Sequence, residues 1–268
     1  MVLGIVGDVH ANAGALDAGL AMLRTRPIDQ LVFLGDLLTY GPDVDPVLSR
    51  VEDELAGGAR IVLGNHDRMY LDLSAGEQAY FDALPPWVRE SADWTRGQFD
   101  IARFQRIPFA PTAAFGEVLV AHANPFPPDP SGFPDWRYLT RAADHQRAAD
   151  HLRLAGARVG VFGHTHRSRI VELPSLRGVD DEDRRILDGW RPVGEGDALS
   201  VNAGTVGQPR NRSATSTVAW VTAHDDGRFD VEIAPIAYDV DRHLAALEAL
   251  PFSPHTAATL ARFFEPGD

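Results

Sequence analysis

Several short apolar runs of this sequence end in side chains that can bind a metal ion or transfer a proton. Five of the ten histidines lie in these clusters, next to aspartate and asparagine. Imidazole, carboxylate and amide groups are ligands of transition metals, and histidine is the commonest general acid or base. The clusters therefore predict metal-assisted or acid–base chemistry. They are Gly7-Asp8-Val9-His10, Gly35-Asp36, Gly64-Asn65-His66-Asp67, His122-Ala123-Asn124 and Gly163-His164-Thr165-His166.

The spacing inside two of the clusters suggests paired ligands. Asp8 and His10 are two residues apart, and so are His164 and His166. In an extended segment, side chains at positions i and i+2 lie on the same face. We therefore expect each pair to present two ligands in one direction. A glycine precedes most of the clusters, as expected where the chain turns sharply out of a strand.

The apolar runs before the clusters are typical of buried β-strands. These runs, with one further run near residue 200, cover residues 2–6, 30–34, 60–63, 117–121, 158–162 and 198–201. Helix-like segments at 13–26 and 45–57 separate the first three runs, and this alternation favours parallel strands. In an open α/β sheet the ligand crevice lies beyond the carboxyl ends of the strands. We therefore expect the clusters to converge on one site.

The rest of the chain is predicted to complete a single α/β domain over residues 1–268. The helical pattern continues over 75–106 and 135–155. After residue 213, a hairpin is expected on the turn Asp225-Asp226-Gly227. The domain then has its chemical motifs at 8–210 and its C-terminal hairpin and helices at 213–268, with the last helices over 241–249 and 255–264.

Two segments interrupt this pattern. The loop at 124–136 holds five prolines and three aromatic residues, Phe126, Phe133 and Trp136, which make it irregular but stiff. Because the loop follows one of the histidine clusters, its rings can either wall the site and stack on a nucleobase or pack only within the loop. The acidic segment at 175–197 is predicted to be a solvated surface loop.

The composition excludes several classes of partner and site. The formal net charge is −13, so the overall field repels nucleic acid and anionic membranes. The chain has no cysteine, which excludes disulfides and thiolate metal sites. No apolar run approaches the ~18 residues of a membrane span, and the chain enters an apolar strand at residue 2 without a basic leader. We therefore predict a cytoplasmic protein without a membrane partner, and the oligomeric state stays open.

Taken in order, the clusters resemble the metal-binding motifs of the calcineurin-like metallophosphoesterase superfamily. The segment VNAGTVGQPR, at residues 201–210, further resembles the NPGSVGQPR segment of the compact bacterial phosphodiesterase branch of that superfamily. The resemblance implies an α/β fold in the form of an αββα sandwich, with two mixed sheets flanked by helices.

The resemblance also implies a centre with two divalent metal ions. The first ion is assigned to Asp8, His10, Asp36 and His166. The second ion is assigned to Asp36, Asn65, His122 and His164, so that Asp36 bridges the two. Such ligands suit manganese, iron, cobalt, nickel or zinc and leave the identity of the metal open. A hydroxide that bridges two such ions is then expected to be the nucleophile.

Further roles follow for residues near the ligands. His66 is expected to act as a general acid that protonates the leaving oxygen, and Asp67 to orient its imidazole. Asn12 is expected to bind substrate through hydrogen bonds within the site. Arg210 and Arg212 are expected to bind a substrate phosphate as bidentate donors, although a plain surface position stays open for both.

The expected function is that of a phosphodiesterase acting on small nucleotide-type diesters. Two divalent ions, two aspartates and a hydroxide leave a local charge of about +1, whereas the protein as a whole repels a polyanion such as duplex nucleic acid. The alternatives among enzymes are a diadenosine polyphosphate hydrolase, a nuclease and a protein phosphatase. A catalytically silent scaffold is a remoter alternative. The retromer subunit of this fold lacks the histidine of the Gly-Asn-His-Asp motif, whereas His66 is present here.

Overall fold

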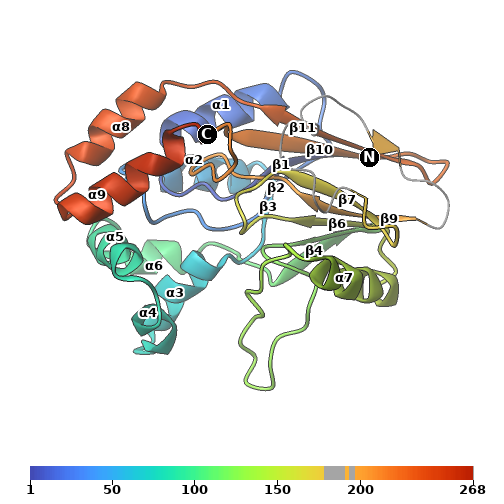
Figure 1. The fold of residues 1–268 in the computed structure, drawn as a ribbon, viewed down its shortest axis with the longest axis horizontal. Helices are drawn as coiled ribbons and strands as arrows, with labels where there is room; N and C mark the ends of the chain where they lie inside the picture. Colours follow the sequence, from blue (N-terminus) through green and yellow to red (C-terminus); the bar gives the residue numbers. More distant parts are fainter. Residues whose placement is uncertain (178–190, 193–196, 268) are drawn as a thin grey trace.

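The computed structural model describes residues 1–177, 191–192 and 197–267. Figure 1 shows the strands gathered in the middle of the molecule, with helices on both sides of them. The strands form two sheets, and each sheet contains parallel and antiparallel pairs. The expected α/β sandwich of two mixed sheets flanked by helices is therefore confirmed.

The first sheet contains the N-terminal strands and the C-terminal hairpin. Its strands are β1 (Val2–Val6), β2 (Gln30–Phe33), β3 (Arg60–Ile61), β8 (Arg191–Pro192), β10 (Thr217–Ala223) and β11 (Phe229–Pro235). Their order in the sheet is β3-β2-β1-β10-β11-β8. β1 lies parallel to β2 and antiparallel to β10, so Leu3 is opposite Gln30 on one side and Val221 on the other. The predicted hairpin is the pair β10 and β11.

The second sheet carries the later motifs. Its strands are β4 (Thr112–Phe115), β5 (Val118–Ala121), β6 (Val159–Phe162), β7 (Arg169–Leu173) and β9 (Ala198–Asn202). Their order is β4-β5-β6-β9-β7, with β5, β6 and β9 parallel. The antiparallel strands β4 and β7 at its two edges were not predicted. β4 is half exposed along its length, so it lacks the continuous apolar run that marks a buried strand.

Aliphatic side chains from both sheets fill the space between them. Ile5 and Val32 of the first sheet lie in one buried cluster with Val161 and Val201 of the second. Helices bury the opposite faces of these strands, and strands buried on both faces must be apolar on both. This requirement explains why the central strands β1, β2, β5 and β6 are nearly continuous apolar runs.

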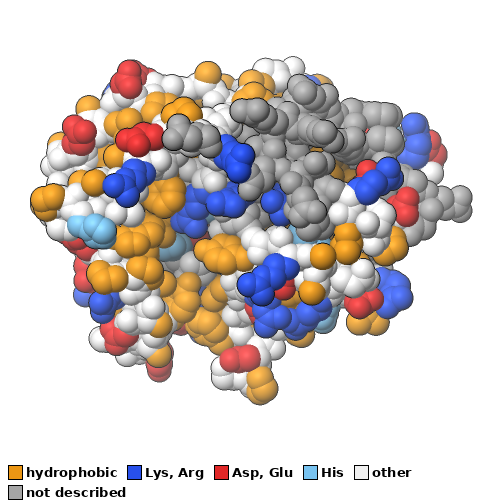
Figure 2. Space-filling view, viewed as in Figure 1, with side chains coloured by type: hydrophobic (Ala, Val, Ile, Leu, Met, Phe, Trp, Pro, Cys, Tyr) orange, Lys and Arg blue, Asp and Glu red, His pale blue; other side chains and the backbone are white. Residues whose placement is uncertain are grey.

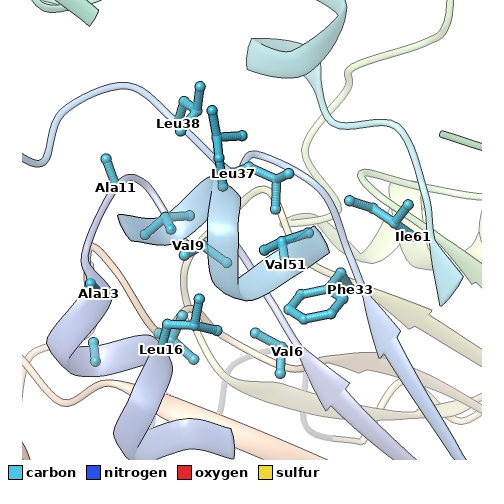
Figure 3. Packing of buried hydrophobic residues seen from close by; sticks show 14 of the residues in the cluster. Val6, Val9, Ala11, Ala13, Leu16, Phe33, Leu37, Leu38, Val51 and Ile61 are labelled. Carbon is cyan, nitrogen blue, oxygen red and sulfur yellow. The ribbon is translucent and has the colours of Figure 1, made fainter. Parts of the chain in front are cut away.

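Helices cover the outer faces of both sheets. α1 (Ala13–Leu23) and α2 (Val44–Ala56) cover the first sheet, where Leu16 and Phe33 lie in the same buried cluster (Figure 3). α7 (Ala142–Leu154) covers the second sheet, against a smaller cluster. In Figure 1, α1 and α7 therefore lie on opposite sides of the strands.

The remaining helices gather at one end of the sandwich, at the left of Figure 1. They are α3 (Asn65–Ser74), α4 (Ala79–Asp82), α5 (Pro86–Arg96), α6 (Ile101–Phe104), α8 (Val240–Glu248), α9 (Pro254–Ala261) and a 3₁₀ turn, η2 (Arg262–Phe264). Val88 of α5, Leu247 of α8 and Leu260 of α9 form a buried cluster with Tyr40. The C-terminal helices therefore pack on the loop that follows β2.

The helical segment predicted at 75–106 is broken into α4, α5 and α6. Gly76 has a φ angle of +87°, which ends the preceding helix. Pro85 and Pro86 open α5, and Gly97 closes it. Glycine and proline therefore interrupt a pattern that hydrophobic spacing alone suggested to be longer.

The helix predicted at 135–155 begins only at Ala142. The residues before it are held in an irregular conformation by Asn124. The side-chain amide of Asn124 donates to the backbone carbonyl oxygens of Asp135 and Arg137, at 2.8 and 2.9 Å. These carbonyl groups are therefore engaged by a distant loop residue and are not part of a helical ladder.

The buried carboxylate of Asp67 fixes the start of α3. It accepts hydrogen bonds from the backbone amides of Asp36 (2.7 Å), Leu37 (3.0 Å) and Gly64 (3.0 Å). An acidic side chain in the first turn is also favoured by the helix dipole. Asp67 therefore joins the loop after β2 to the N-terminus of α3.

In the described part of the chain, no helix combines the length and apolarity needed to cross a bilayer. The single-domain organisation and the cytoplasmic location stay predictions. Most of the acidic loop predicted at 175–197 lies outside the described residues.

Replacing Asp67 with alanine should lower the free energy of unfolding by about 3 kcal/mol, because buried amides left without an acceptor cost ~1–3 kcal/mol each. Urea unfolding of the metal-free protein at pH 8 measures this change. The matched control is Asp72→Ala in the same helix, which removes a carboxylate paired with Arg68 nearer the surface and should cost less than about 1 kcal/mol. Equal losses in the two variants would contradict the structural role of Asp67.

Candidate metal centre

The structure brings the six predicted histidine and aspartate ligands into two overlapping groups. The groups are Asp8, His10, Asp36 and His166, and Asp36, His122 and His164. Within each group, one ligand atom per residue lies within 4.8 Å of the others, and every member is buried. Asn65 joins the second group, because its Oδ1 lies 3.0 Å from Nε2 of His122. The clusters therefore converge as the strand-end argument predicted, and Asp36 is common to both groups.

The backbone at these positions is left-handed, not extended. Asp8 and His10 have φ angles of 41° and 46°, and His164 and His166 have φ angles of 64° and 59°. The prediction that each pair offers two ligands in one direction from an extended segment is therefore wrong. Asp8 and His10 do share a group, but His164 and His166 belong to different groups. Positive φ angles are costly for residues with a Cβ, and they cluster at functional sites.

Each of the four imidazoles has one ring nitrogen bound to a backbone carbonyl oxygen. Nδ1 of His10 donates to Leu38, Nδ1 of His122 to Leu34, Nδ1 of His166 to Gln208 and Nε2 of His164 to Trp136. Such a bond fixes the tautomer and aims the second ring nitrogen. In the neutral ring, the second nitrogen of each histidine therefore presents a lone pair to the centre.

The inward atoms crowd together in a way that suits cations. Nε2 of His10 lies 3.1 Å from Nε2 of His166, and Nε2 of His122 lies 3.2 Å from Nδ1 of His164. Two lone pairs at such a distance repel each other unless a proton or a cation lies near both. Oδ2 of Asp36 is buried 3.4 Å from His122 Nε2 and has no hydrogen-bond partner among the described residues. With imidazole, carboxylate and amide donors, these residues fit a pair of divalent transition-metal ions.

The charge states of the histidines agree with this fit. Burial lowers the pKa of His10, His164 and His166 well below 6.5, so these rings are neutral. Burial also disfavours the charged form of His122, but the nearby carboxylates, Asp36 above all, raise its pKa to about 9. The positive charge on His122 thus balances buried acids that a metal cation would otherwise neutralise.

Two glycines allow the loops to approach the acidic ligands. A Cβ atom on Gly64 would lie 2.2 Å from Oδ1 of Asp36, and one on Gly163 would lie 2.4 Å from Oδ2 of Asp8. Both distances are far below van der Waals contact. The close approach at Gly163 lets the backbone amide of His164 donate to the carboxylate of Asp8, at 3.0 Å.

His66 lies in the first turn of α3, with its ring centroid 5.3 Å from that of His10. The contact that was expected between Asp67 and this imidazole is absent, because the carboxylate of Asp67 binds backbone amides instead. Nε2 of His66 lies 3.0 Å from Oη of Tyr40, and its Nδ1 has no hydrogen-bond partner among the described residues. Burial lowers the pKa of His66.

Asn12 caps a helix and is not available to a substrate. Its Oδ1 accepts from the amide of Ala15 at the start of α1, and its Nδ2 donates to the carbonyl of Gly207 and to Oη of Tyr238. The residue is fully buried. The structure therefore corrects the prediction that Asn12 binds substrate.

Arg210 lies beside the histidines of the centre. Burial lowers the pKa of His66 and His166, and the guanidinium of Arg210 lowers both further. Nε and Nη2 of Arg210 donate to Oε1 of Gln208, at 3.2 and 2.8 Å. Arg212 is exposed, and its backbone carbonyl oxygen accepts a hydrogen bond from the backbone amide of Gly267. The substrate-binding roles of both arginines stay predictions.

Of the aromatic residues in the loop at 124–136, one lies in the core and two lie near the site. Phe126 is buried in the cluster beneath α7, so the structure decides between the two alternatives for this ring in favour of packing and against a place in the wall of the site. The ring centroid of Trp136 lies 5.8 Å from that of His122. Phe133 lies against Trp136, with centroids 6.4 Å apart.

Sequence reasoning missed three tyrosines around the centre. They are Tyr40, bound to His66; Tyr80, whose Oη accepts from Nδ2 of Asn65 at 3.0 Å; and Tyr138, whose ring stacks on His164 at 4.3 Å and 15°. Tyr40 lies in the Asp36 segment and could have been found as a polar residue close to a ligand. Tyr80 and Tyr138 come from segments without a ligand pattern, so the sequence offers no comparable signal for them.

Solved structures with the same fold cover nearly the whole chain. A metallophosphoesterase from Sphaerobacter thermophilus superimposes with a TM-score of 0.73 at 22% identity, over 98% of this chain and 100% of that chain. The protein PH1004 from Pyrococcus horikoshii superimposes with a TM-score of 0.70 at 13% identity, over 100% of this chain and 98% of that chain. At these identities the likeness shows the fold.

Curated relatives match over the whole chain or over a short part of it. The uncharacterized protein MJ0912 of Methanocaldococcus jannaschii is 24% identical over 251 residues, which are 90% of this chain and 89% of that protein. A symmetrical bis(5'-nucleosyl)-tetraphosphatase of Photorhabdus laumondii is 41% identical over 73 residues. That match spans only 27% of this chain and 26% of that relative.

The family assignment rests on a match that contains all the residues of the centre. The model of the calcineurin-like phosphoesterase superfamily domain matches residues 1–226. The fold and the order of the motifs agree with this match. The chain therefore belongs to the calcineurin-like phosphoesterase superfamily.

Proposed function

We propose that this protein is a metal-dependent phosphodiesterase that hydrolyses small esters of the nucleotide type. One observation carries the proposal: four buried imidazoles, each bound to a carbonyl oxygen, turn their second nitrogen toward two buried aspartates. Membership of the superfamily supports a phosphoester hydrolase. The choice of diesters and of nucleotides rests on charge and on aromatic side chains, which are considered below.

The candidate ligands divide between two ions. One ion would be held by Asp8, His10, Asp36 and His166, and the other by Asp36, Asn65, His122 and His164. When bound, divalent ions supply Lewis-acid chemistry, because they neutralise charge on the phosphate and make water a nucleophile near neutral pH. Manganese, iron, cobalt, nickel and zinc all suit these donors.

The protein's own residues would complete the reaction. His66 is placed beside the first group, and we assign it the proton that the leaving oxygen needs. Arg210 lies close enough to His66 and His166 to lower the pKa of both beyond the effect of burial, so its guanidinium is well placed to bind a phosphate oxygen. Asp67 keeps these groups in position through the backbone.

Charge favours a small substrate. The formal net charge of −13 repels an extended polyanion. Figure 2 shows basic side chains around the middle of one face, with acidic side chains mostly toward its edges. A local basic area on an acidic protein suits a compact anion better than duplex nucleic acid, which needs phosphate contacts along an extended surface.

Aromatic side chains favour a nucleotide. Tyr138 stacks on His164 with one face of its ring, and 45% of the residue is exposed. Trp136 lies beside His122, which belongs to the same group as His164. A nucleobase can stack on exposed rings of this kind without base-specific hydrogen bonds.

A dinucleoside polyphosphate is a second candidate substrate. The similarity over 73 residues to a symmetrical bis(5'-nucleosyl)-tetraphosphatase favours it. Both candidates carry a nucleobase next to a phosphate chain, so the same aromatic rings would serve either of them.

The deciding experiment compares kcat/KM for a dinucleotide, a dinucleoside tetraphosphate, a phosphomonoester and a labelled DNA duplex in one Mn²⁺ buffer at physiological salt. We expect the dinucleotide or the tetraphosphate to be the best substrate and the duplex to be cleaved poorly, for the electrostatic reason given above. A duplex or a phosphomonoester at the top of the ranking would contradict the proposed substrate class.

Replacing Asp36 with asparagine should remove metal and activity together, because a neutral amide, unlike a carboxylate, has no negative charge with which to bridge two cations. We expect activity to fall by more than about 100-fold, since replacing residues that only hold the metal ligands in place already lowers metal affinity or activity by about 10–100-fold. Elemental analysis after Mn²⁺ loading and desalting measures the metal per chain. The control is Asp17→Asn, which alters a carboxylate paired with Arg50 at the surface and should leave both quantities unchanged. Full metal content in Asp36→Asn would contradict the assignment.

Replacing His66 with alanine should leave the metal content intact and lower kcat by ~10²–10⁴-fold, as expected for a lost general acid. The defect should be large for a ribose leaving group and small for nitrophenolate, which needs little protonation. Steady-state kinetics with a dinucleotide and with bis(p-nitrophenyl) phosphate measure the difference. The same defect with both substrates would show that His66 does not protonate the leaving group.

A further inference from the structure

The phenol of Tyr40 occupies the position that Asp67 was expected to take beside His66. Its Oη lies 3.0 Å from Nε2 of His66, and both residues are buried. Asp67 cannot also serve the imidazole, because its two oxygens accept from backbone amides. The hydroxyl of Tyr40 is thus the hydrogen-bond partner of the His66 ring among the described residues.

The ring of Tyr40 is held firmly on several sides. Its backbone has a φ angle of 68°, and its amide donates to Oγ of Ser91 in α5 at 2.8 Å. The ring stacks on Trp87, with centroids 5.4 Å apart, and lies 4.6 Å from the ring of His10. Leu247 and Leu260 of the C-terminal helices complete its surroundings. Because the hydroxyl of Tyr40 is held in place, its hydrogen bond can fix the orientation of the His66 ring.

We propose that Tyr40 is a positioning residue that holds Nε2 of His66, so that Nδ1 is left to protonate the leaving oxygen. This inference rests on the proposed function. The imidazolium is the less populated form, because burial lowers the pKa of His66, and for the same reason it gives up a proton readily. In this form, Nε2–H donates to Oη of Tyr40 and Nδ1–H is free for the substrate. As water adds to phosphorus, the bond from phosphorus to the leaving oxygen breaks and that oxygen takes the Nδ1 proton. Nε2 keeps its proton, and the proton released by water passes to solvent and restores the imidazolium.

The buried Nδ1 of His66 supports this assignment. It has no hydrogen-bond partner among the described residues. A buried nitrogen without a partner is costly in a structural residue, but it is required of a proton donor that meets its acceptor only in the substrate complex. The hydrogen bond to Tyr40 also prevents the ring from flipping, which would exchange the two nitrogens.

The test is Tyr40→Phe, which keeps the ring and its stacking and removes only the hydroxyl. For a dinucleotide, we expect kcat to fall about 10-fold or more, as for other lost hydrogen bonds to a charged group, with KM and metal content unchanged. With bis(p-nitrophenyl) phosphate the fall should be small. In the His66→Ala background, Tyr40→Phe should change kcat by less than about 2-fold, because the residue acts through His66.

The matched control is Tyr238→Phe, which removes a phenol that is bonded to the helix-capping Asn12. It should affect stability and leave kcat unchanged. A second readout is the ¹⁵N chemical shift of the His66 ring nitrogens, which should show a hydrogen-bonded Nε2 in the parent protein and lose that signature in Tyr40→Phe. This readout does not depend on any substrate.

The outcomes separate this inference from the proposed function. If His66→Ala is impaired but Tyr40→Phe matches the parent protein in kcat and in ¹⁵N shifts, the positioning role is overturned and the general acid stands. An equal loss from Tyr40→Phe with and without His66 would also overturn it. If His66→Ala itself costs nothing, or no phosphate ester is cleaved, the proposed function fails first, and the role of Tyr40 in the reaction fails with it.

Discussion

The centre depends on one buried carboxylate that is not itself a candidate ligand. Asp67 accepts hydrogen bonds from amides on both the loop after β2 and the start of α3. These two segments carry Asp36, Asn65 and His66, so a single side chain sets their relative positions. Burial raises the pKa of Asp67 to about 7, whereas its hydrogen bonds from backbone amides favour the charged form. In that form these hydrogen bonds are strong, and burial removes competition from water. A surface ion pair at the same place would hold the loops much less firmly.

The ligand loops are also held by hydrogen bonds of the ligands themselves, made by atoms that face away from the centre. Each of the four imidazoles is anchored to a carbonyl oxygen, and Asp8 is anchored to the amide of His164. The cost of this arrangement is visible in the positive φ angles of Asp8, His10 and Asp36. A left-handed backbone conformation costs free energy in a residue with a Cβ, and two nitrogen lone pairs in close contact repel each other. Both persist only where other interactions offset the cost. Cations shared between the groups would supply that compensation.

Parts of the chain that lack ligands give the site its surroundings. Tyr40 is packed by α5 and by the C-terminal helices, which lie beyond the residues matched by the family model. Trp136 and Tyr138, which flank the second group, come from the end of the proline-rich loop and from the segment that directly follows it. The centre is therefore built from residues within the family match, whereas less regular segments surround it, as is common where variable loops surround a rigid scaffold.

The sequence by itself determined the buried strands that carry the motifs, the order of the motifs and the ligand types, because apolar runs and their polar ends are local features. It also predicted the convergence of the clusters, since parallel strands place their carboxyl ends together. It misjudged Asp67 and Asn12 and left the place of Phe126 open, because the partners of these residues lie on other elements, and it missed the tyrosines for the same reason. Side-chain partners and backbone handedness depend on which loops meet in space. A carboxylate can orient an imidazole or bind amides with the same sequence around it, and only the packing of α3 against the loop after β2 decided between the two.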